Sequence, residues 1–279
     1  MFTSYFRKLD EYGIIPVVKL DSADSAVPLA RALIDGMLPI AEVTFRTDAA
    51  EESIKRMKEA FPEMLLGAGT VSSPDQVKRA VAAGAEFIVS PGFNETVVKY
   101  CVENGIPVLP GCSNPSDIER ALSFGLTTVK FFPAEVMGGL KAIKAMAAPY
   151  VNVYFIPTGG INEANLMDYL SFQKVIACGG SWMVPDNLVR SGKFEEIKGL
   201  AEAAVKKSLG LKLGNIEING EGERCIALMT RSVESARRYF EQLGLRFNGS
   251  TEIKDENGKT KEIYFADKFG GIAIYLLKN

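Results

Sequence analysis

The chain has no histidine among its 279 residues. This absence excludes a catalytic triad built on imidazole and the usual zinc sites that histidine ligates. A general base in this protein must be a carboxylate, a lysine, a tyrosine or a thiolate. Any metal would need hard oxygen ligands, and we expect no metal site.

Cysteine is also scarce, and the chain holds no CxxC pair. The spacing favours reduced thiols in the cytoplasm over a disulfide framework. We expect no apolar signal segment, because charged residues already occur within residues 1–13. No run is long and apolar enough to cross a bilayer, so we expect a cytoplasmic protein. The four scattered cysteines are Cys101, Cys112, Cys178 and Cys225.

A large excess of charge of one sign is missing as well. The 32 lysines and arginines nearly balance the 34 acidic residues, which gives a formal net charge of -2. Since no long basic run occurs either, the sequence gives no indication of a nucleic-acid or anionic-membrane partner. The length is sufficient for one large domain and a small one.

Short apolar runs recur along the chain, and a helix-forming stretch follows each of them. Alternating strands and helices predict parallel strands joined by right-handed crossovers. Eight such units predict an α/β fold, a (β/α)8 TIM barrel over residues 1–210. A doubly wound open sheet is the alternative, which the absence of Gly-x-Gly-x-x-Gly after a strand weakens. The predicted strands span residues 14–20, 39–45, 64–69, 86–90, 106–109, 126–132, 152–157 and 174–178.

Three of the predicted helices carry start and stop signals. Ser73 and Asn114 each precede a proline, as an N-cap precedes a proline in the first helical turn, and Asn94 opens a helix in a similar way. The stop signals are glycines, which tolerate the left-handed conformation at a helix end: Gly84, Gly105 and Gly125.

Residues 127–135 combine a buried-strand composition with a lysine. Because side chains alternate along a strand, Lys130 and Phe132 share one face and Val129 and Phe131 the other. An ammonium group beside phenylalanine rings loses hydration, which disfavours its charged form. A neutral amine can attack a ketone and form a Schiff base. The alternative is a lysine at a strand end whose head group reaches water.

The second predicted strand places charged residues where a barrel interior would be. Val43 and Phe45 suit the outer helical layer, so we expect Glu42, Thr44 and Arg46 to point inward. Buried charges are costly unless they pair or serve a ligand. A buried ion pair that only holds the strand is the alternative.

Glycine-rich turns follow three predicted strands at their carboxyl ends, where barrel enzymes place their chemistry. The segment 67–70 brings a flexible backbone and the Thr70 hydroxyl to this end. The segments 158–160 and 179–181 follow the seventh and eighth strands, where backbone N–H groups frequently bind phosphate in barrels. Each segment taken alone is also compatible with a plain turn.

Together these motifs resemble the class I 2-keto-3-deoxy-6-phosphogluconate / 4-hydroxy-2-oxoglutarate (KDPG/KHG) aldolase family. The matching segments occur in the same order over about residues 1–210, and the run Lys-Phe-Phe-Pro-Ala-Glu is the most specific of them. One small departure is Met37, which stands where many relatives carry a glycine after Gly36. The matching segments are 42–47, 67–71, 89–92, 130–135, 157–161 and 179–182.

The resemblance implies that Lys130 forms the Schiff base and that Glu42 is the general acid and base. It also implies a cytoplasmic homotrimer with no cofactor beyond the covalent Schiff base, and a keto-acid sugar phosphate as its small-molecule partner. The other matching site residues are Arg46 and Thr70 for the pyruvate carboxylate, Phe132 beside the bound keto acid, Thr158 as a substrate contact, and Gly159, Gly160 and Ser181 for the phosphate.

The implied reaction cleaves 2-dehydro-3-deoxy-6-phosphogluconate to pyruvate and glyceraldehyde 3-phosphate, in sugar-acid catabolism of the Entner–Doudoroff type. A further candidate substrate is 4-hydroxy-2-oxoglutarate. Two other functions stay open. One is a phosphosugar epimerase or isomerase in which Glu42 works alone and Lys130 binds an anion, and the other is a non-enzymatic, phosphosugar-sensing barrel.

Residues 211–279 predict a small α+β domain of βαβββ order after a connector at 210–215. Asn257-Gly258 is a hairpin signal between two of its strands. The predicted helix at 232–243 has an apolar face of ordinary core spacing that ends at Leu243. The other expected elements are strands at 223–229, 245–252, 261–266 and 271–277.

The segment 235–245 resembles one module of the glyoxalase/bleomycin-resistance superfamily. That superfamily often binds a metal through histidine and glutamate. Here histidine is absent and the final strand offers no carboxylate, so we expect no metal and no second activity. Because one module leaves a face exposed, we expect it to pack on another subunit or on the barrel.

Overall fold

The computed structural model describes residues 2–220, 222–256 and 258–279. Contacts within the chain divide it into two compact units, Met1–Val205 and Lys206–Asn279. The sequence predicts domains of 1–210 and 211–279 for the same division.

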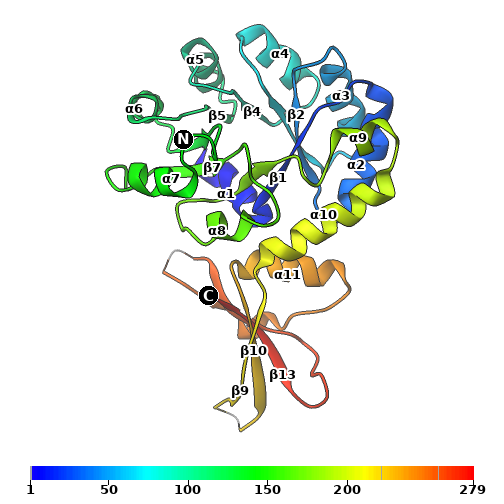
Figure 1. Ribbon diagram of the computed structural model, residues 1–279. Coiled ribbons are helices and arrows are strands. Elements are labelled where there is room, and N and C mark those ends of the chain that lie inside the picture. Colours follow the sequence, from blue (N-terminus) through cyan, green and yellow to red (C-terminus); the bar gives the residue numbers. More distant parts are fainter. Residues whose placement is uncertain (1, 221, 257) are drawn as a thin grey trace. The chain divides into compact units, whose positions relative to one another are not determined.

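The first unit is built on parallel strands (Figure 1). Six of them form one sheet in the order β5-β4-β3-β2-β1-β8, and β6 and β7 form a separate pair. Single parallel bridges, Gly111 with Lys130 and Thr158 with Gly179, link this pair to β5 and β8. The strands are β1 (Ile14–Val18), β2 (Ile40–Thr44), β3 (Leu65–Gly69), β4 (Phe87–Val89), β5 (Val108–Leu109), β6 (Thr128–Phe131), β7 (Tyr154–Pro157) and β8 (Cys178–Gly180).

Seven of these strands lie inside the predicted runs. The eighth begins at Cys178, the last residue of the run predicted at 174–178, because Val175 makes only an isolated bridge to Phe155. β2 and β3 are buried at every position, as expected for strands in the interior of an α/β unit.

Helices lie outside these strands (Figure 1). The predicted N-caps are confirmed: Ser73, Asn94 and Asn114 each accept a hydrogen bond from the backbone N–H three residues later. The helices are α1 (Thr3–Tyr12), α2 (Ala26–Asp35), α3 (Ala50–Ala60), α4 (Pro74–Ala82), α5 (Glu95–Glu103), α6 (Pro115–Ser123), α7 (Gly139–Ala147), α8 (Leu166–Leu170), α9 (Asp186–Arg190) and α10 (Phe194–Leu209), with a 3-10 turn at Ala23–Ser25.

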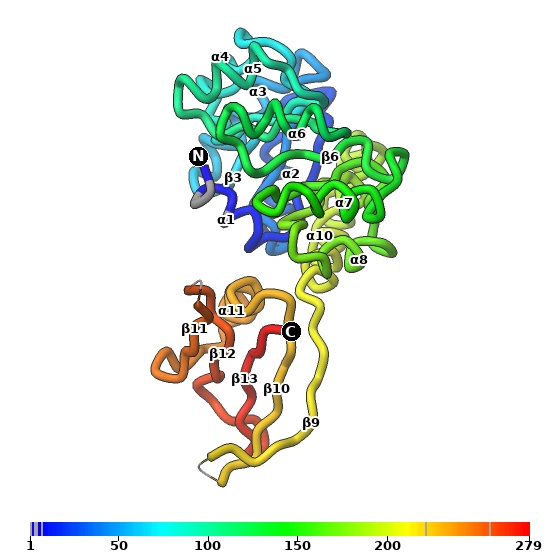
Figure 2. The backbone as a smooth tube through the Cα atoms, turned by 90° about the vertical axis from the view of Figure 1, so that its left-hand side faces the viewer, coloured from blue at the N-terminus to red at the C-terminus, as the bar shows by residue number. Residues whose placement is uncertain are grey.

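The described part of the second unit contains a five-stranded sheet of order β11-β12-β13-β10-β9 and the helix α11 (Figure 2). β10 and β13 are parallel, and the other neighbours are antiparallel. The elements are β9 (Lys212–Ile218), β10 (Arg224–Thr230), α11 (Val233–Gln242), a 3-10 turn (Gly249–Thr251), β11 (Ile253–Lys254), β12 (Thr260–Tyr264) and β13 (Ala273–Lys278).

Two sequence-based assignments in this unit are wrong. The connector predicted at 210–215 belongs largely to β9, so the order is ββαβββ. The strand predicted at 245–252 is replaced by an isolated bridge from Phe247 to Phe265 and a 3-10 turn. The Asn248 side chain accepts the Ser250 N–H and so stabilises the turn, not a strand.

The helix of the second unit agrees with its prediction except at its end. Val233 and Ala236 are fully buried, whereas Leu243 is 50% exposed because α11 stops at Gln242. In the hairpin signal Asn257-Gly258, Asn257 lies outside the described residues.

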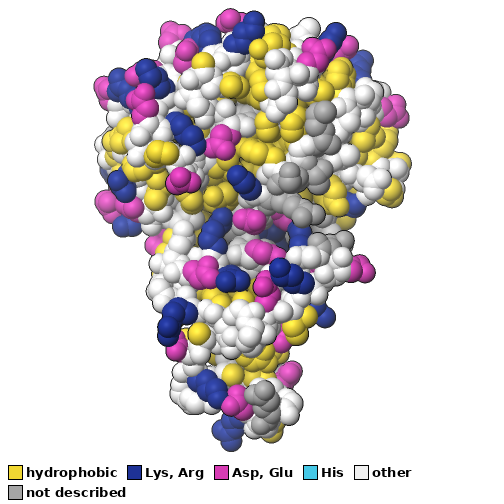
Figure 3. All heavy atoms as spheres, turned by 180° about the vertical axis from the view of Figure 1, so that it is seen from behind, with side chains coloured by type: hydrophobic (Ala, Val, Ile, Leu, Met, Phe, Trp, Pro, Cys, Tyr) yellow, Lys and Arg dark blue, Asp and Glu magenta, His cyan; other side chains and the backbone are white. Residues whose placement is uncertain are grey.

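The surface of the molecule carries both signs of charge. On the face drawn in Figure 3, basic and acidic side chains are interspersed among apolar and uncharged ones. Within the described ranges, no helix combines the length and hydrophobicity that a membrane span requires.

Candidate active site

Lys130 on β6 and Glu42 on β2 meet in the interior of the first unit. Lys130 Nζ donates a hydrogen bond to Glu42 Oε1 at 3.3 Å. The side chains are only 7% and 4% exposed. Burial of either charge alone would be costly, so each makes the burial of the other tolerable.

The Glu42 carboxylate fits in its position because the neighbouring residue Gly69 has no side chain. A Cβ built on Gly69, in the neighbouring strand β3, would lie 2.2 Å from Glu42 Oε1. Any larger residue at this position must therefore displace the carboxylate. The buried Thr44 donates to the Val18 carbonyl at 2.9 Å, which ties the end of β2 to β1.

Lys130 has an aromatic neighbour on its own segment. Its Nζ lies 5.2 Å from the centroid of the Phe132 ring, within the range of a cation–π contact. Val129 and Phe131 are completely buried. The alternation predicted for this strand thus brings the amine and the Phe132 ring together.

Arg46 lies just beyond β2 and not on it, since the strand ends at Thr44. Its side chain is exposed. Its Nε donates to Thr44 Oγ1 at 3.2 Å, which holds the guanidinium near the carboxyl ends of the strands. Thr70 follows β3, is half-buried, and has a positive φ of 58°.

Thr158 follows β7 and is 7% exposed. Its Oγ1 is buried without a hydrogen-bond partner among the described residues. A Cβ on Gly179 would lie 2.4 Å from this oxygen, so the ends of β7 and β8 approach closely. Buried hydroxyls are usually paired, and this one is free to bind a ligand.

The loops after β6 and β7 are joined through their backbones. The Ala134 N–H donates to the Thr158 carbonyl at 2.8 Å, and the Glu135 N–H donates to the Gly159 carbonyl at 3.1 Å. Gly159 and Gly160 have positive φ values of 99° and 82°. Such a conformation favours glycine and turns the backbone sharply.

Ser181 is exposed and directly follows β8. The structure therefore brings all the predicted site residues to one end of the parallel strands. Lys130 and Glu42 lie on strands, and the others follow the ends of β2, β3, β6, β7 and β8: Arg46, Thr70, Phe132, Thr158, Gly159, Gly160 and Ser181.

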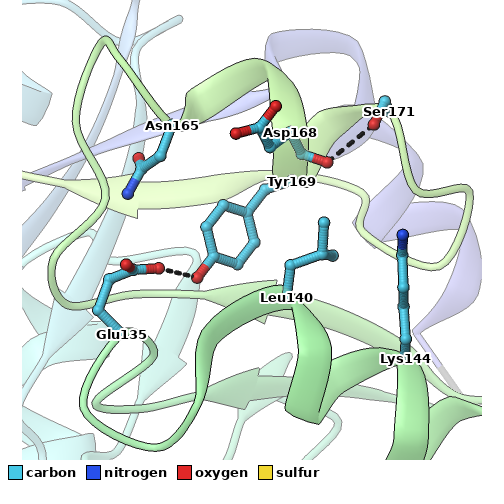
Figure 4. A pocket seen from close by; sticks show the side chains of 7 residues that line it. All are labelled: Glu135, Leu140, Lys144, Asn165, Asp168, Tyr169 and Ser171. Atoms are coloured by element: carbon cyan, nitrogen blue, oxygen red, sulfur yellow. Dashed lines mark hydrogen bonds between the residues drawn. The ribbon is translucent and has the colours of Figure 1, made fainter.

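One side-chain contact beside the site is not predicted by the sequence. The hydroxyl of Tyr169, on α8, donates to the Glu135 carboxylate beside a pocket between α7 and α8 (Figure 4). Burial, followed by the contact with Glu135, raises the pKa of Tyr169 well above its usual range. Glu135 closes the Lys-Phe-Phe-Pro-Ala-Glu motif, but nothing in the sequence indicates Tyr169 as its partner.

The cysteines are all free and buried. Burial raises the pKa of the Cys101 thiol to about 12. In the part of the chain that the structure describes, no group of three or more cysteine, aspartate or glutamate side chains is placed to hold a metal ion.

A buried lysine in contact with a carboxylate, at the carboxyl ends of parallel strands, defines an α/β enzyme of the class I aldolase type. The model of the KDPG and KHG aldolase family matches residues 6–200, so the chain belongs to that family.

Individual relatives agree with the family match. The chain is 48% identical over 201 residues to the 2-dehydro-3-deoxy-phosphogluconate aldolase of Treponema pallidum (strain Nichols), covering 72% of this chain and 96% of that protein. A solved KDPG aldolase from Legionella pneumophila has a TM-score of 0.69 at 37% identity and covers 70% and 95% of the two chains. There pyruvate is captured at low pH as a covalent carbinolamine intermediate. The corresponding enzyme of Zymomonas mobilis ZM4, solved with 3-phosphoglycerate, has a TM-score of 0.67 at 40% identity and covers 72% and 93%.

Proposed function

We propose that this protein cleaves 2-dehydro-3-deoxy-6-phosphogluconate to pyruvate and glyceraldehyde 3-phosphate, and that it also accepts 4-hydroxy-2-oxoglutarate. The observation that carries the proposal is the buried contact of 3.3 Å between Lys130 Nζ and Glu42 Oε1. The names of the relatives support the choice of substrate.

The scaffold of this activity is a closed (β/α)8 barrel. The six-stranded sheet and the β6-β7 pair are linked by the bridges from Gly111 to Lys130 and from Thr158 to Gly179, which support closure on both sides. Lys130 and Glu42 then face each other across the barrel interior.

The first step needs a neutral amine. Glu42 accepts a proton from the Lys130 ammonium through their hydrogen bond, and the free amine attacks the C2 ketone of the substrate. Glu42 returns this proton to the hydroxyl of the carbinolamine, which leaves as water, so that Lys130 carries a protonated imine and Glu42 is again a carboxylate. The positive imine is an electron sink next to C3.

Carbon–carbon cleavage follows from a second proton transfer. The Glu42 carboxylate removes the proton of the C4 hydroxyl, C4 becomes an aldehyde, and the C3–C4 bonding electrons move into the imine. This gives the enamine of pyruvate on Lys130. Protonation at C3 by Glu42 and hydrolysis of the imine then release pyruvate and restore the amine.

The flanking residues bind the two ends of the substrate. The planar guanidinium of Arg46 suits the pyruvate carboxylate, to which the Thr70 hydroxyl also donates. Phe132 packs on the keto acid and Thr158 Oγ1 donates to it. The backbone of Gly159 and Gly160, together with the hydroxyl of Ser181, holds the phosphate.

Borohydride reduction in the presence of pyruvate tests this function. The wild-type protein is expected to form a stable adduct at Lys130, located by peptide mass spectrometry, and Lys130→Arg is expected to form none. Lys141→Arg, at an exposed position of α7, is the matched control and keeps wild-type trapping. If Lys130→Arg is trapped at the wild-type rate, the proposal is wrong.

Borohydride trapping and pyruvate release together distinguish the aldolase from the two alternative functions. A phosphosugar epimerase or isomerase gives no reducible pyruvate adduct, and a non-enzymatic sensor binds the sugar acid without producing pyruvate. Measuring pyruvate release from 2-dehydro-3-deoxy-6-phosphogluconate and from 4-hydroxy-2-oxoglutarate ranks the two substrates.

We further propose a cytoplasmic homotrimer that works without a metal. The four free cysteines support a reducing compartment. The trimer rests on the family resemblance, and sedimentation equilibrium tests it. The second unit is proposed to be a glyoxalase-like module without activity of its own that packs on another subunit or on the barrel.

A further inference from the structure

The strand β9 forms an open edge of the sheet in the second unit (Figure 2). An edge strand leaves half of its backbone N–H and C=O groups without a ladder partner. Three large apolar side chains on β9 are strongly exposed: Leu213 (71%), Ile216 (62%) and Ile218 (74%). Natural edge strands are usually shielded from pairing by charge, proline or a covering element, so an apolar edge of this kind favours pairing with another strand.

The three apolar side chains point to the same face of the sheet. Leu213 lies opposite Leu228, and Ile216 lies opposite Ile226. Residues 226 and 228 share a face because they are two positions apart on β10. The irregularity in the register between them inserts one extra residue into β9 at Gly214-Asn215, which keeps Leu213 and Ile216 on one face despite their odd spacing.

The charges of β9 lie on the opposite face and have a symmetric arrangement. Lys212 lies opposite Met229 and Glu217 lies opposite Cys225, and both side chains are exposed. If β9 is laid antiparallel on a copy of itself about Gly214-Asn215, Lys212 faces the Glu217 of that copy. Leu213 then faces the Ile216 of the copy, and each pairing occurs twice.

We propose that β9 pairs antiparallel with β9 of a second copy of this chain. The two five-stranded sheets become continuous about a twofold axis beside Gly214-Asn215. On one face the apolar side chains of both copies form a single stripe, and on the other face two lysine–glutamate pairs form across the strands. A seven-residue edge is a small interface, so the association depends on protein concentration.

Charge reversal in the full-length protein tests this pairing. Glu217→Lys and Lys212→Glu each bring like charges opposite one another, and each is expected to halve the mass of the assembly in sedimentation velocity at high concentration. The double variant Lys212→Glu/Glu217→Lys restores the opposite charges and the wild-type mass. Lys261→Glu, at an exposed position of β12, is the control and leaves the mass unchanged.

Aldolase turnover stays at the wild-type level in all of these variants, and unchanged circular dichroism and thermal unfolding of the second unit show that they fold. Hydrogen exchange of residues 212–218 gives a second measurement, because paired edges slow exchange at high concentration and dilution accelerates it. The proposal is overturned if either single reversal keeps the wild-type mass, or if the double variant does not recover it.

A second and independent inference concerns Tyr169 and Glu135, and it rests on the proposed function. Tyr169 is only 2% exposed and donates to the Glu135 carboxylate (Figure 4). A Cβ on Gly160 would lie 2.5 Å from Glu135 Cγ, so the Glu135 stem covers the glycine turn directly. The Asn165 amide donates to the Gly160 carbonyl at 3.1 Å from the side of α8.

The first residue of α7, Gly139, packs directly against the same hydrogen bond. A Cβ on Gly139 would lie 2.9 Å from the Tyr169 hydroxyl and 3.1 Å from Glu135 Oε1. Two segments of the chain, 135–139 and 160–169, therefore meet at one side-chain contact. We infer that Tyr169 and Glu135 are positioning residues that hold the Gly159-Gly160 turn for the phosphate of the substrate.

A comparison of two substrates tests this role. Tyr169→Phe is expected to raise the KM for 2-dehydro-3-deoxy-6-phosphogluconate about tenfold, since small displacements of a binding loop are costly. The KM for 4-hydroxy-2-oxoglutarate, which has no phosphate, and the rate of pyruvate trapping stay within about twofold of wild type. Glu135→Ala reproduces Tyr169→Phe, whereas Glu135→Gln keeps an acceptor for the hydroxyl and restores the KM.

Tyr150→Phe is the matched control, because the Tyr150 hydroxyl donates to Glu119 at 3.0 Å on the surface. It is expected to leave both KM values unchanged. The positioning role is overturned if Tyr169→Phe raises the KM for both substrates equally, or if Glu135→Ala leaves both KM values at the wild-type level. Loss of pyruvate trapping in the wild-type protein would instead contradict the proposed function itself.

Discussion

The two units of this chain bury different kinds of side chain. In the first unit, the buried polar residues include a lysine and a glutamate in mutual contact. In the second unit, the buried polar residues within the described ranges are hydroxyl-bearing serines and threonines, and its core contains the stacked rings of Tyr264 and Tyr275, 4.8 Å apart. Buried charge is costly, so its presence in one unit alone indicates where the chemistry lies.

The largest expected effect comes from replacing a carboxylate of the first unit, and the same replacement in the second unit is its control. Glu42→Gln removes the proposed base and should lower kcat about a thousandfold, as general acid–base catalysis contributes on this scale. Glu234→Gln in the second unit, whose Oε1 accepts the Thr260 N–H at 2.7 Å, should leave turnover unchanged. Steady-state release of pyruvate measures both. Similar losses in the two variants would remove the functional distinction between the units.

The next effect concerns the aromatic core of the second unit. The Phe265 ring is 8% exposed and contacts the rings of Phe240 and Phe247. Phe265→Ala should destabilise this unit by about 3 kcal/mol, because it opens a cavity. Hydrogen exchange in residues 206–279 should accelerate, whereas turnover and the fluorescence of Trp182, the single tryptophan, keep their wild-type values. A fall in turnover at 25 °C would show that catalysis depends on the second unit.

A smaller effect is expected from crowding the active-site carboxylate. The Cβ introduced by Gly69→Ala meets Glu42 Oε1 at 2.2 Å and must displace it. Misplacement of a catalytic group on this scale should lower kcat about a hundredfold. Gly199→Ala is the control, since a Cβ there meets nothing within 4 Å on helix α10. That variant should keep full turnover, and a normal kcat in Gly69→Ala would contradict the geometry of the site.

The smallest effect concerns a backbone position in the first unit. Met37 has a positive φ of 63°, a conformation that is unfavourable for a residue with a side chain. Met37→Gly should therefore stabilise the first unit by about 0.5–1 kcal/mol, measured as an increase in the unfolding midpoint of Trp182 fluorescence. A decrease in that midpoint would show that packing of the half-buried Met37 side chain outweighs the backbone term.

Features that depend on local chemistry could be predicted from the sequence. The strands of the first unit follow from runs of apolar residues, and the helix starts at Ser73, Asn94 and Asn114 follow from their side-chain oxygens. Lys130 and Glu42 were predicted as partners through their motifs and the alternation of their strands, and the structure places them 3.3 Å apart.

Features that depend on irregular register or on distant contacts could not be predicted in this way. The apolar residues of β9 have an odd spacing, because the extra residue at Gly214-Asn215 interrupts the strand alternation. The contact between Tyr169 and Glu135 joins α8 to the loop after β6, and no local pattern encodes such a pairing. The end of β2 at Thr44, one residue before the predicted end of the strand, also cannot be seen in the sequence.

The closeness of Glu42 to Lys130 imposes an order on the proposed reaction. Before a keto acid arrives, the carboxylate is the counterion of the ammonium and is occupied in that role. Once the nitrogen has bonded to carbon and left its original partner, the same oxygen is released to turn to the hydroxyl of the substrate. The carboxylate thus acts first on Lys130 and reaches the substrate hydroxyl only after the covalent intermediate exists, which protects unbound sugar acids from premature proton abstraction.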